Sequence, residues 1–168
     1  MMFNTEPRWV VIGNSGSGKS TLAERLGGAF RLPIHDLDDV HWAADGRKRP
    51  ETEAMAQVAK ITGGDTWIIE GVYGWLAEIA LARATSLVWL DLPWAECREG
   101  LLARGLRRGM TAEDQKALLG WAEGYWTRTT SSSFKGHEQL YDLYEGDKTR
   151  LRSRADIFAF GVTGVRGT

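Results

Sequence analysis

The segment from Gly13 to Ser20 constrains the fold of this chain more than any other part of it. Its eight residues match the pattern G-x-x-x-x-G-K-S. The apolar run Trp9-Val10-Val11-Ile12 before it is typical of a strand buried on both faces, and a helical pattern follows from Lys19 to about Phe30. A buried strand, a glycine-rich turn and a helix start in this order predict a cradle for phosphate groups.

Each residue type in this loop has a chemical reason to be there. The backbone N–H groups and the positive end of the helix surround phosphate oxygens, Lys19 reaches the outer phosphates, and the Ser20 hydroxyl is a ligand for Mg²⁺. The alternative is a glycine-rich turn without a ligand. We predict a bound nucleoside triphosphate, with ATP and Mg²⁺ as cofactors. The predicted nucleotide-binding residues are Gly13, Asn14, Ser15, Gly16, Ser17, Gly18, Lys19, Ser20 and Thr21.

Strand and helix patterns alternate five times along the chain, which predicts an α/β fold with a parallel sheet and helices on both faces. The segment 109–146 is helical but polar and glycine-interrupted, with a break near 129–133. We expect one domain over residues 1–168. The expected strands cover 8–12, 34–37, 67–70, 86–91 and 149–153, the last as an edge strand, and the expected helices cover 19–30, 50–62, 75–83 and 93–104.

The charge and hydropathy of the chain exclude some partners. A formal net charge of −1 provides no basic excess for nucleic acid, which is therefore not an expected partner. No apolar run approaches the roughly 20 residues needed to cross a bilayer. We expect a cytoplasmic protein without membrane contact.

Four segments carry a resemblance to a known family. They are the phosphate loop, Leu37-Asp38, Trp67-Ile68-Ile69-Glu70-Gly71 and Leu90-Asp91-Leu92-Pro93. Together they resemble the P-loop kinases related to adenylate kinase, and most closely the bacterial DNA topology modulation proteins. The resemblance implies a three-layer P-loop NTPase fold like that of nucleoside monophosphate kinases. It also implies a five-stranded parallel sheet, an acceptor region after the second strand and a helical lid at about 98–136.

Glu70 and Asp91 are the further candidates for magnesium binding. Glu70 ends an apolar strand directly before Gly71, where the family commonly has Asp, and a carboxylate there holds the metal through water. The alternative for Glu70 is an ordinary acid at a strand end. Asp91 precedes Leu92-Pro93, so it is either a magnesium neighbour or a cap of the next helix.

Acidic and aromatic residues predict where an acceptor molecule binds. Asp36 and Asp38 share one side if their strand continues that far. Asp38 matches acids that touch magnesium or orient the acceptor hydroxyl in related sugar and shikimate kinases, although a helix-cap role stays open. Aromatic rings after the second and third strands either wall the pocket or pack internally. The predicted acceptor-binding residues are Asp36, Asp38, Trp42, Tyr73 and Trp75.

An arginine cluster after the fourth strand falls where the resemblance places the lid. Arg104 matches a family arginine, whereas an earlier family arginine falls on Gly100 and is missing. Cations here stabilise charge on the transferred phosphoryl group, and the alternative is a solvated basic face. The predicted catalytic residues are Lys19, Asp38, Arg104 and Arg108.

These residues predict an ATP-dependent phosphotransferase, a kinase acting on a small molecule. The acceptor is a nucleoside monophosphate, another phosphorylated metabolite or a hydroxyl compound. The alternative is a nucleotide-binding switch or regulatory protein with slow hydrolysis. The chain has no N-K-x-D sequence for reading guanine, which counts against a switch of the GTP type.

Overall fold

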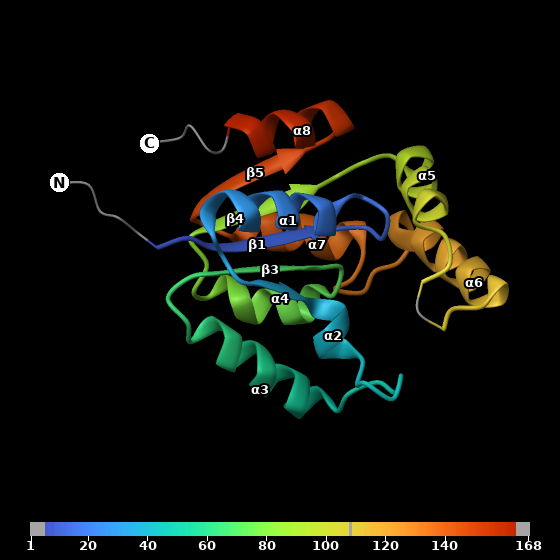
Figure 1. The fold of residues 1–168 in the computed structure, drawn as a ribbon, viewed down its shortest axis with the longest axis horizontal. Helices are drawn as coiled ribbons and strands as arrows, with labels where there is room; N and C mark the ends of the chain where they lie inside the picture. Colours follow the sequence, from blue (N-terminus) through green and yellow to red (C-terminus); the bar gives the residue numbers. More distant parts are fainter. Residues whose placement is uncertain (1–5, 108, 164–168) are drawn as a thin grey trace.

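Five parallel strands form the centre of the protein in the order β2-β3-β1-β4-β5 (Figure 1). The computed structural model describes residues 6–107 and 109–163. This sheet, with helices on both faces, confirms the predicted fold class. The strands are β1 (Arg8–Gly13), β2 (Ile34–Asp36), β3 (Trp67–Gly71), β4 (Ser86–Leu90) and β5 (Asp147–Leu151).

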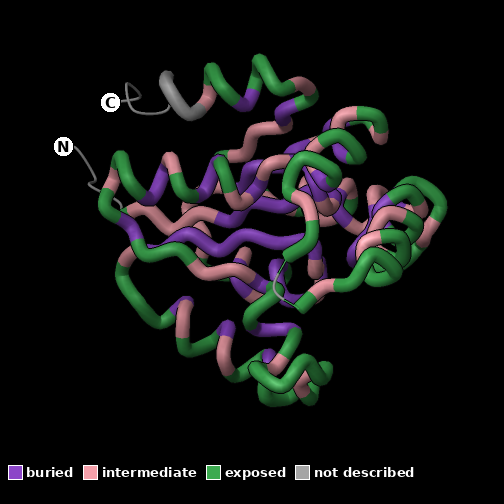
Figure 2. Tube along the Cα trace, turned by 45° about the vertical axis from the view of Figure 1, so that its right-hand side comes forward, coloured by how far each residue is buried: buried purple, intermediate pink, exposed green. Residues whose placement is uncertain are grey.

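Side chains alternate between two hydrophobic cores along the buried strands. Val10 and Ile12 join the core under α2, α3, α4 and α7, whereas Val11 joins the core under α1, α5 and α8. Figure 2 shows the buried strands between the half-exposed helices. Because alternate side chains of each strand point to opposite faces of the sheet, helices pack on both faces and the fold has three layers. These helices are α1 (Lys19–Phe30), α2 (Leu37–His41), α3 (Glu51–Thr62), α4 (Gly74–Leu81), α5 (Trp94–Arg104), α7 (Phe134–Leu143) and α8 (Arg154–Thr163).

The segment between β4 and β5 is helical and interrupted, as expected. After α5 come α6 (Ala112–Glu123) and the 3-10 helix η1 (Gly124–Trp126), and the chain is irregular until α7 begins. Figure 1 shows α5 and α6 beyond the carboxyl ends of the strands, on the side where the loop after β1 lies. A capping box between Thr111 and Asp114 fixes the start of α6.

Several boundaries differ from the sequence-based expectations. β5 begins at Asp147 and ends at Leu151, two residues earlier than expected, and it is an edge strand. Two helices, α2 and α8, were not expected at all. Met55 of α3 is 46% exposed, because Ala54 and Val58 occupy the inner face of that helix.

The candidate residues lie close together because the five parallel strands have their carboxyl ends on the same side of the sheet. The phosphate loop follows β1, Asp36 ends β2, and Glu70 lies next to the end of β3. Asp36 and Glu70 are register partners on neighbouring strands, so their side chains project from the same face. Such an edge is where open α/β sheets bind ligands.

Within residues 6–107 and 109–163, none of the helices combines the length and the apolar character that a bilayer crossing requires.

Candidate active site

The phosphate loop has a backbone that only glycine accommodates at two positions. Gly16 and Gly18 have φ values of 80° and 97°, in the left-handed region. A Cβ atom on Gly16 would lie 2.1 Å from the carbonyl oxygen of Cys97. The loop is therefore pressed against α5, and larger residues at these positions would open it.

The loop presents backbone N–H groups at the start of α1. The first intrahelical bond of α1 runs from Leu22 N to the Gly18 carbonyl, so the N–H groups of Lys19, Ser20 and Thr21 have no acceptor within the helix. The Asn14 side chain accepts from Ser15 N at 2.8 Å and donates to the Ala122 carbonyl at 2.9 Å. Free N–H groups at a helix start are a ready site for phosphate oxygens.

Lys19 is buried inside this loop with its charge only partly neutralised. Its Nζ donates to the Asn14 carbonyl oxygen at 2.7 Å, and the residue is 8% exposed. Burial lowers the pKa of the ammonium group, and the negative charges of Glu70 and Asp38 oppose that change. A phosphate anion beside Lys19 would stabilise the buried charge.

Ser20 and Glu70 form the polar contact at the mouth of the loop. The Ser20 hydroxyl donates to Glu70 Oε1 at 2.8 Å. Burial raises the pKa of the Glu70 carboxyl group, while Lys19 and the Ser20 hydroxyl act in the opposite direction. Two of the three residues predicted from sequence to bind magnesium thus lie side by side.

Asp36 and Asp38 both face the site, but not through a continuous strand. β2 ends at Asp36 and Asp38 lies in the first turn of α2, so the strand does not continue far enough for its alternation to place Asp38. Asp36 Oδ1 caps α2 by accepting from Asp38 N at 2.8 Å. Burial, then the charges of Glu70 and Asp38, raise the pKa of Asp36 to about 7. Asp36 is thus both a helix cap and part of a crowded carboxylate group.

Two cavities meet at the phosphate loop. The smaller, of about 580 Å³, lies between the loop, α1 and α5, and Arg154 closes one side of it. The larger, of about 1110 Å³, lies between the loop, α2, the segment after β3 and the irregular segment after η1. Four residues line both cavities: Lys19, Ser20, Arg104 and Arg107.

The remaining predicted loop residues divide between the two cavities and the interior. Gly16, Gly18 and Thr21 line the smaller cavity, and Ser15 lines the larger one. The others shape the loop from behind: Gly13, Asn14 and Ser17 are buried and line neither cavity.

All five predicted acceptor residues line the larger cavity. Its aromatic wall is built on His41, whose ring stacks on Tyr73 with centroids 3.9 Å apart. Trp42 Nε1 donates to the Tyr73 hydroxyl at 3.0 Å, and Trp75 lies edge-on to His41. The charge of Asp38 contributes, after burial, to raising the pKa of Tyr73. The five residues are Asp36, Asp38, Trp42, Tyr73 and Trp75.

Arg104 ends α5 at the junction of the two cavities. Burial and the neighbouring Arg107 lower its pKa, while Asp38, Asp36 and Glu70 act against that. Arg107 also lines both cavities, so a pair of guanidinium groups faces the carboxylates. Arg108, which we predicted to be catalytic, lies outside the described residues.

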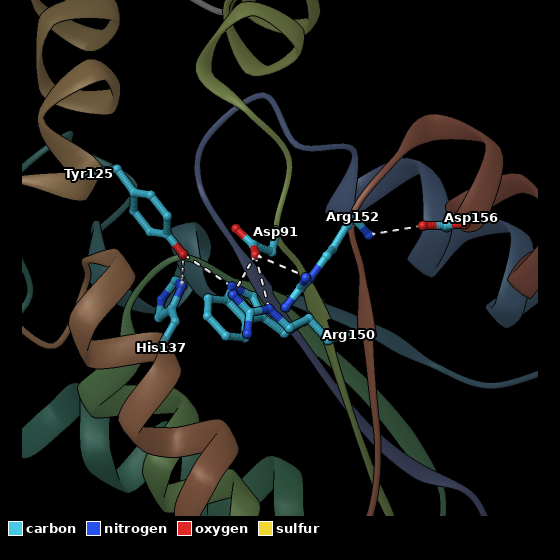
Figure 3. Close-up of polar contacts among 7 residues, drawn as sticks. Asp91, Tyr125, His137, Arg150, Arg152 and Asp156 are labelled. Atoms are coloured by element: carbon cyan, nitrogen blue, oxygen red, sulfur yellow. Dashed lines mark hydrogen bonds and ion pairs between the residues drawn. The ribbon is translucent and has the colours of Figure 1, made fainter.

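Asp91 is engaged elsewhere. Arg150 binds Asp91 Oδ2 through Nε at 2.9 Å and Nη2 at 2.7 Å, and Arg152 approaches the same oxygen at 4.0 Å (Figure 3). The side chain does not cap α5, because Pro93 is the N-cap without a side-chain bond. Asp91 lines neither cavity, and its contacts fix β4 to β5.

A buried chain of hydrogen bonds supports the larger cavity from behind. Trp89 Nε1 donates to the Tyr125 hydroxyl at 3.2 Å, and Tyr125 lies 2.8 Å from His137 Nδ1 (Figure 3). His137 Nε2 lies 2.8 Å from the Val72 carbonyl oxygen, so Nε2 carries the proton and Nδ1 accepts from Tyr125. Burial lowers the pKa of His137 to about 3. The neutral ring thus fixes the segment that carries Tyr73.

Sequence reasoning missed one wall of the larger cavity. Arg128 stacks over Trp121 at 4.0 Å and donates through Nη2 to the Ser132 carbonyl at 2.9 Å. Together with Thr130 and Ser131 these residues form that wall, and Lys48 lies on the side of Trp42. The only sequence signal was the polar break near 129–133, which is also typical of a surface loop.

Comparison with solved structures places the fold among P-loop kinases. A shikimate kinase from Bacteroides thetaiotaomicron aligns with a TM-score of 0.61 at 12% identity, over 96% of this chain and 99% of that one. A shikimate kinase from Acinetobacter baumannii in complex with shikimate gives 0.59 at 14%, over 98% and 93%. A gluconokinase from Sinorhizobium meliloti gives 0.57 at 17%, over 96% and 93%. The chain therefore has the kinase-like P-loop NTPase fold.

Sequence comparisons reach less far. No family model matches the chain. One curated protein, the small ribosomal subunit biogenesis GTPase RsgA of Streptomyces avermitilis, is 37% identical over 92 residues. That match spans 53% of this chain but only 23% of the relative. It points to a P-loop NTPase, and the finer resemblance to DNA topology modulation proteins stays a hypothesis.

Proposed function

We propose that this protein is an ATP-dependent phosphotransferase that acts on a hydroxyl group of a small molecule. The observation that carries the proposal is the junction of the two cavities at Lys19, Ser20, Arg104 and Arg107. One cavity borders the phosphate loop as a triphosphate requires, and the other opens beyond it. A terminal phosphoryl group at the junction would be reached from both sides, which is the geometry of transfer.

The transfer itself forms one bond and breaks one. The acceptor oxygen attacks the γ-phosphorus, the bond between that phosphorus and the β–γ bridging oxygen breaks, and ADP leaves. The hydroxyl proton passes to the carboxylate of Asp38, which lies in the acceptor cavity. Lys19, Arg104 and Arg107 stabilise the charge spread over the phosphoryl oxygens.

The residues present fit a magnesium ion. Ser20 and Glu70 bring a hydroxyl and a carboxylate together at 2.8 Å, and hard oxygen donors of this kind are the ligands that Mg²⁺ takes. Among the described residues no group of three or more His, Cys, Asp or Glu forms a complete metal site. Phosphate oxygens would therefore supply part of the coordination, as is usual for Mg²⁺. When bound, the ion neutralises charge on the β- and γ-phosphates. Asp91, held by Arg150, is left out of this proposal.

The acids of the larger cavity favour a hydroxyl acceptor over a phosphorylated one. Lys19, Arg104 and Arg107 at the junction are assigned to the transferred phosphoryl group, which leaves Lys48 and Arg128 as the remaining cations among the described lining residues. Asp36, Asp38 and Glu70 face the junction, and their mutual repulsion contributes to the raised pKa of Asp36. Arg128 is committed to backbone carbonyl oxygens of Trp121 and Ser132. A nucleoside monophosphate would bring further negative charge against these carboxylates, whereas a hydroxyl donates to them.

The remaining parts of the proposal concern organisation. We propose a single kinase-like domain over residues 1–168, with a lid at about residues 98–136. Closure would bring Arg104 and Arg107 onto the phosphates and exclude water. The cytoplasmic location stays a prediction, as does the absence of nucleic acid among the partners.

A nucleotide-release assay across matched acceptors tests the proposal. The panel pairs hydroxyl compounds with their phosphorylated forms, such as adenosine with AMP, and includes gluconate and shikimate. We expect at least one acceptor to accelerate ADP formation well above the rate with water, and Lys19→Ala to abolish it. A protein that binds ATP but shows no acceleration with any acceptor would contradict the phosphotransferase assignment.

The partial match to a GTPase keeps one second candidate. A switch protein that hydrolyses nucleotide slowly would show the same phosphate loop, and RsgA carries the name of a GTPase. The second cavity of about 1110 Å³ beside the loop argues for an acceptor instead. A rate that no small molecule changes, together with tight GTP binding, would favour the switch.

A further inference from the structure

Arg154, the first residue of α8, reaches the phosphate loop from the far end of the sequence. Its Nη1 donates to the Ser17 carbonyl oxygen at 3.1 Å, and its Nη2 donates to the Gly16 carbonyl oxygen at 3.1 Å. Nη2 also donates to the Glu96 carbonyl oxygen in the first turn of α5 at 2.9 Å. One guanidinium group therefore joins the loop, α5 and α8.

We propose that Arg154 is a positioning residue of the nucleotide site, which sets the phosphate loop for phosphates by holding the carbonyl groups of Gly16 and Ser17. In a trans peptide unit the C=O and the following N–H point in opposite directions. Holding the Ser17 carbonyl therefore fixes where the Gly18 N–H points. A carbonyl turned toward a phosphate would repel it, so these bonds keep the loop in its binding form.

The glycines around Arg154 show that the space for its guanidinium is built into the site. A Cβ on Gly18 would lie 2.9 Å from Nη1, and a Cβ on Gly100 would lie 2.9 Å from Nη2. The same Cβ on Gly100 would lie 2.3 Å from the Gly16 carbonyl oxygen. Any side chain at position 100 would therefore displace both the loop and the arginine.

The position of Arg154 is fixed by packing of α8 rather than by the arginine itself. Ile157 is buried in the core that contains Leu22 and Leu26 of α1. Arg25 Nη2 donates to the Ile157 carbonyl oxygen at 3.0 Å, which adds a second tie between α1 and α8. Removing the Arg154 side chain should leave this packing in place, so its effect on the loop can be measured in a folded protein.

The inference rests on the nucleotide site of the proposed function, and titration calorimetry with ATP and ADP separates the two. Because charge-assisted hydrogen bonds are the stronger ones in proteins, we expect Arg154→Ala to weaken the binding of both nucleotides by at least about 10-fold. The affinities for ATP and ADP should fall by similar factors, because the loop holds phosphates that both nucleotides contain. In turnover, KM for ATP should rise while kcat changes little.

Two further variants test the geometry. Arg154→Lys keeps the charge but lacks the planar fork, so it should recover only part of the affinity. Gly100→Ala should lower the affinity for ATP and ADP as Arg154→Ala does, although Gly100→Ala removes no charge. The matched controls are Arg152→Ala, whose side chain is 66% exposed, and Gly28→Ala near the end of α1, whose Cβ would meet nothing within 4 Å. Both should bind like the wild type.

The outcomes are distinguishable. A folded Arg154→Ala protein with unchanged ATP and ADP affinity, beside a wild type that binds both, would overturn the positioning role and leave the proposed function intact. A drop in kcat at unchanged KM would also overturn it, since that marks contact with the transition state. If the wild type binds neither nucleotide, the proposed function fails and this inference with it.

Discussion

The Ser20 hydroxyl donates to Glu70 Oε1 at 2.8 Å, which joins the phosphate loop after β1 to the end of the neighbouring strand β3. Glu70 is 3% exposed, and burial raises the pKa of its carboxyl group. The carboxylate and the hydroxyl supply two neighbouring hard oxygen ligands, which are the kind that Mg²⁺ prefers.

Glu70→Gln should therefore raise the Mg²⁺ concentration that turnover requires. The amide keeps the shape of the carboxyl group but loses its charge, and losing such a partner typically costs about 10–100-fold in metal affinity. Turnover measured against Mg²⁺ concentration at saturating ATP should shift by that amount. Glu78→Gln, an exposed acid on α4, is the control. Unchanged magnesium dependence in Glu70→Gln would rule out this role.

Arg104→Ala should slow turnover far more than it weakens ATP binding. Arg104 lines both cavities, and removing one donor to a transition-state charge costs about 10²–10³ in kcat. Arg98→Ala is the matched control, because Arg98 is exposed on the same helix and lines neither cavity. Equal losses in kcat and in ATP affinity would instead indicate simple phosphate docking.

Asp36 should make the ligand-free protein less stable as the pH rises. Its pKa is about 7 in the folded protein against an ordinary value of 3.8, so the folded state retains a proton that the unfolded chain releases. The free energy of unfolding therefore falls between about pH 4 and 8. Denaturant unfolding at pH 5 and pH 8 should show a smaller decrease for Asp36→Asn than for the wild type. Identical pH slopes would contradict the assignment.

Gly27 and Gly28 should respond in opposite directions to alanine. A Cβ on Gly28 meets nothing within 4 Å, so Gly28→Ala should stabilise the protein by about 0.5–1 kcal/mol through helix propensity. A Cβ on Gly27 would lie 2.6 Å from Ile34 Cδ1 of β2, and the overpacking should cost about 1–3 kcal/mol. Urea unfolding of the two variants measures both effects, and equal stabilities would contradict the packing argument.

The helix that contains this pair ends where the sequence pattern predicts. The expected helix over 19–30 is confirmed by α1, which continues to Phe30 through the poor helix formers Gly27 and Gly28. Gly27 packs closely against Ile34 of β2, a contact that only the tertiary structure shows.

Helix α2, in contrast, was not predicted from the sequence. A single hydrogen bond from Asp38 N to Asp36 turns the chain where strand alternation was expected. The missed helix α8 has an apolar sequence with little periodic pattern, so its packing on α1 decides its structure.

The phosphate loop, the parallel sheet and the acids at the strand ends could all be predicted from the sequence, because they depend on local spacing and on the alternation of buried residues. Which of those acids share a site depends instead on contacts between distant segments of the chain. The register of β2 and β3 places Asp36 beside Glu70, which lies 34 positions further along the chain. Asp91 instead binds Arg150, which is 59 positions away, and so lies outside the site. The reach of Arg154 to Gly16 spans 138 positions. Contacts between residues so far apart in the sequence depend on the order in which the five strands pair, and no local sequence pattern specifies that order.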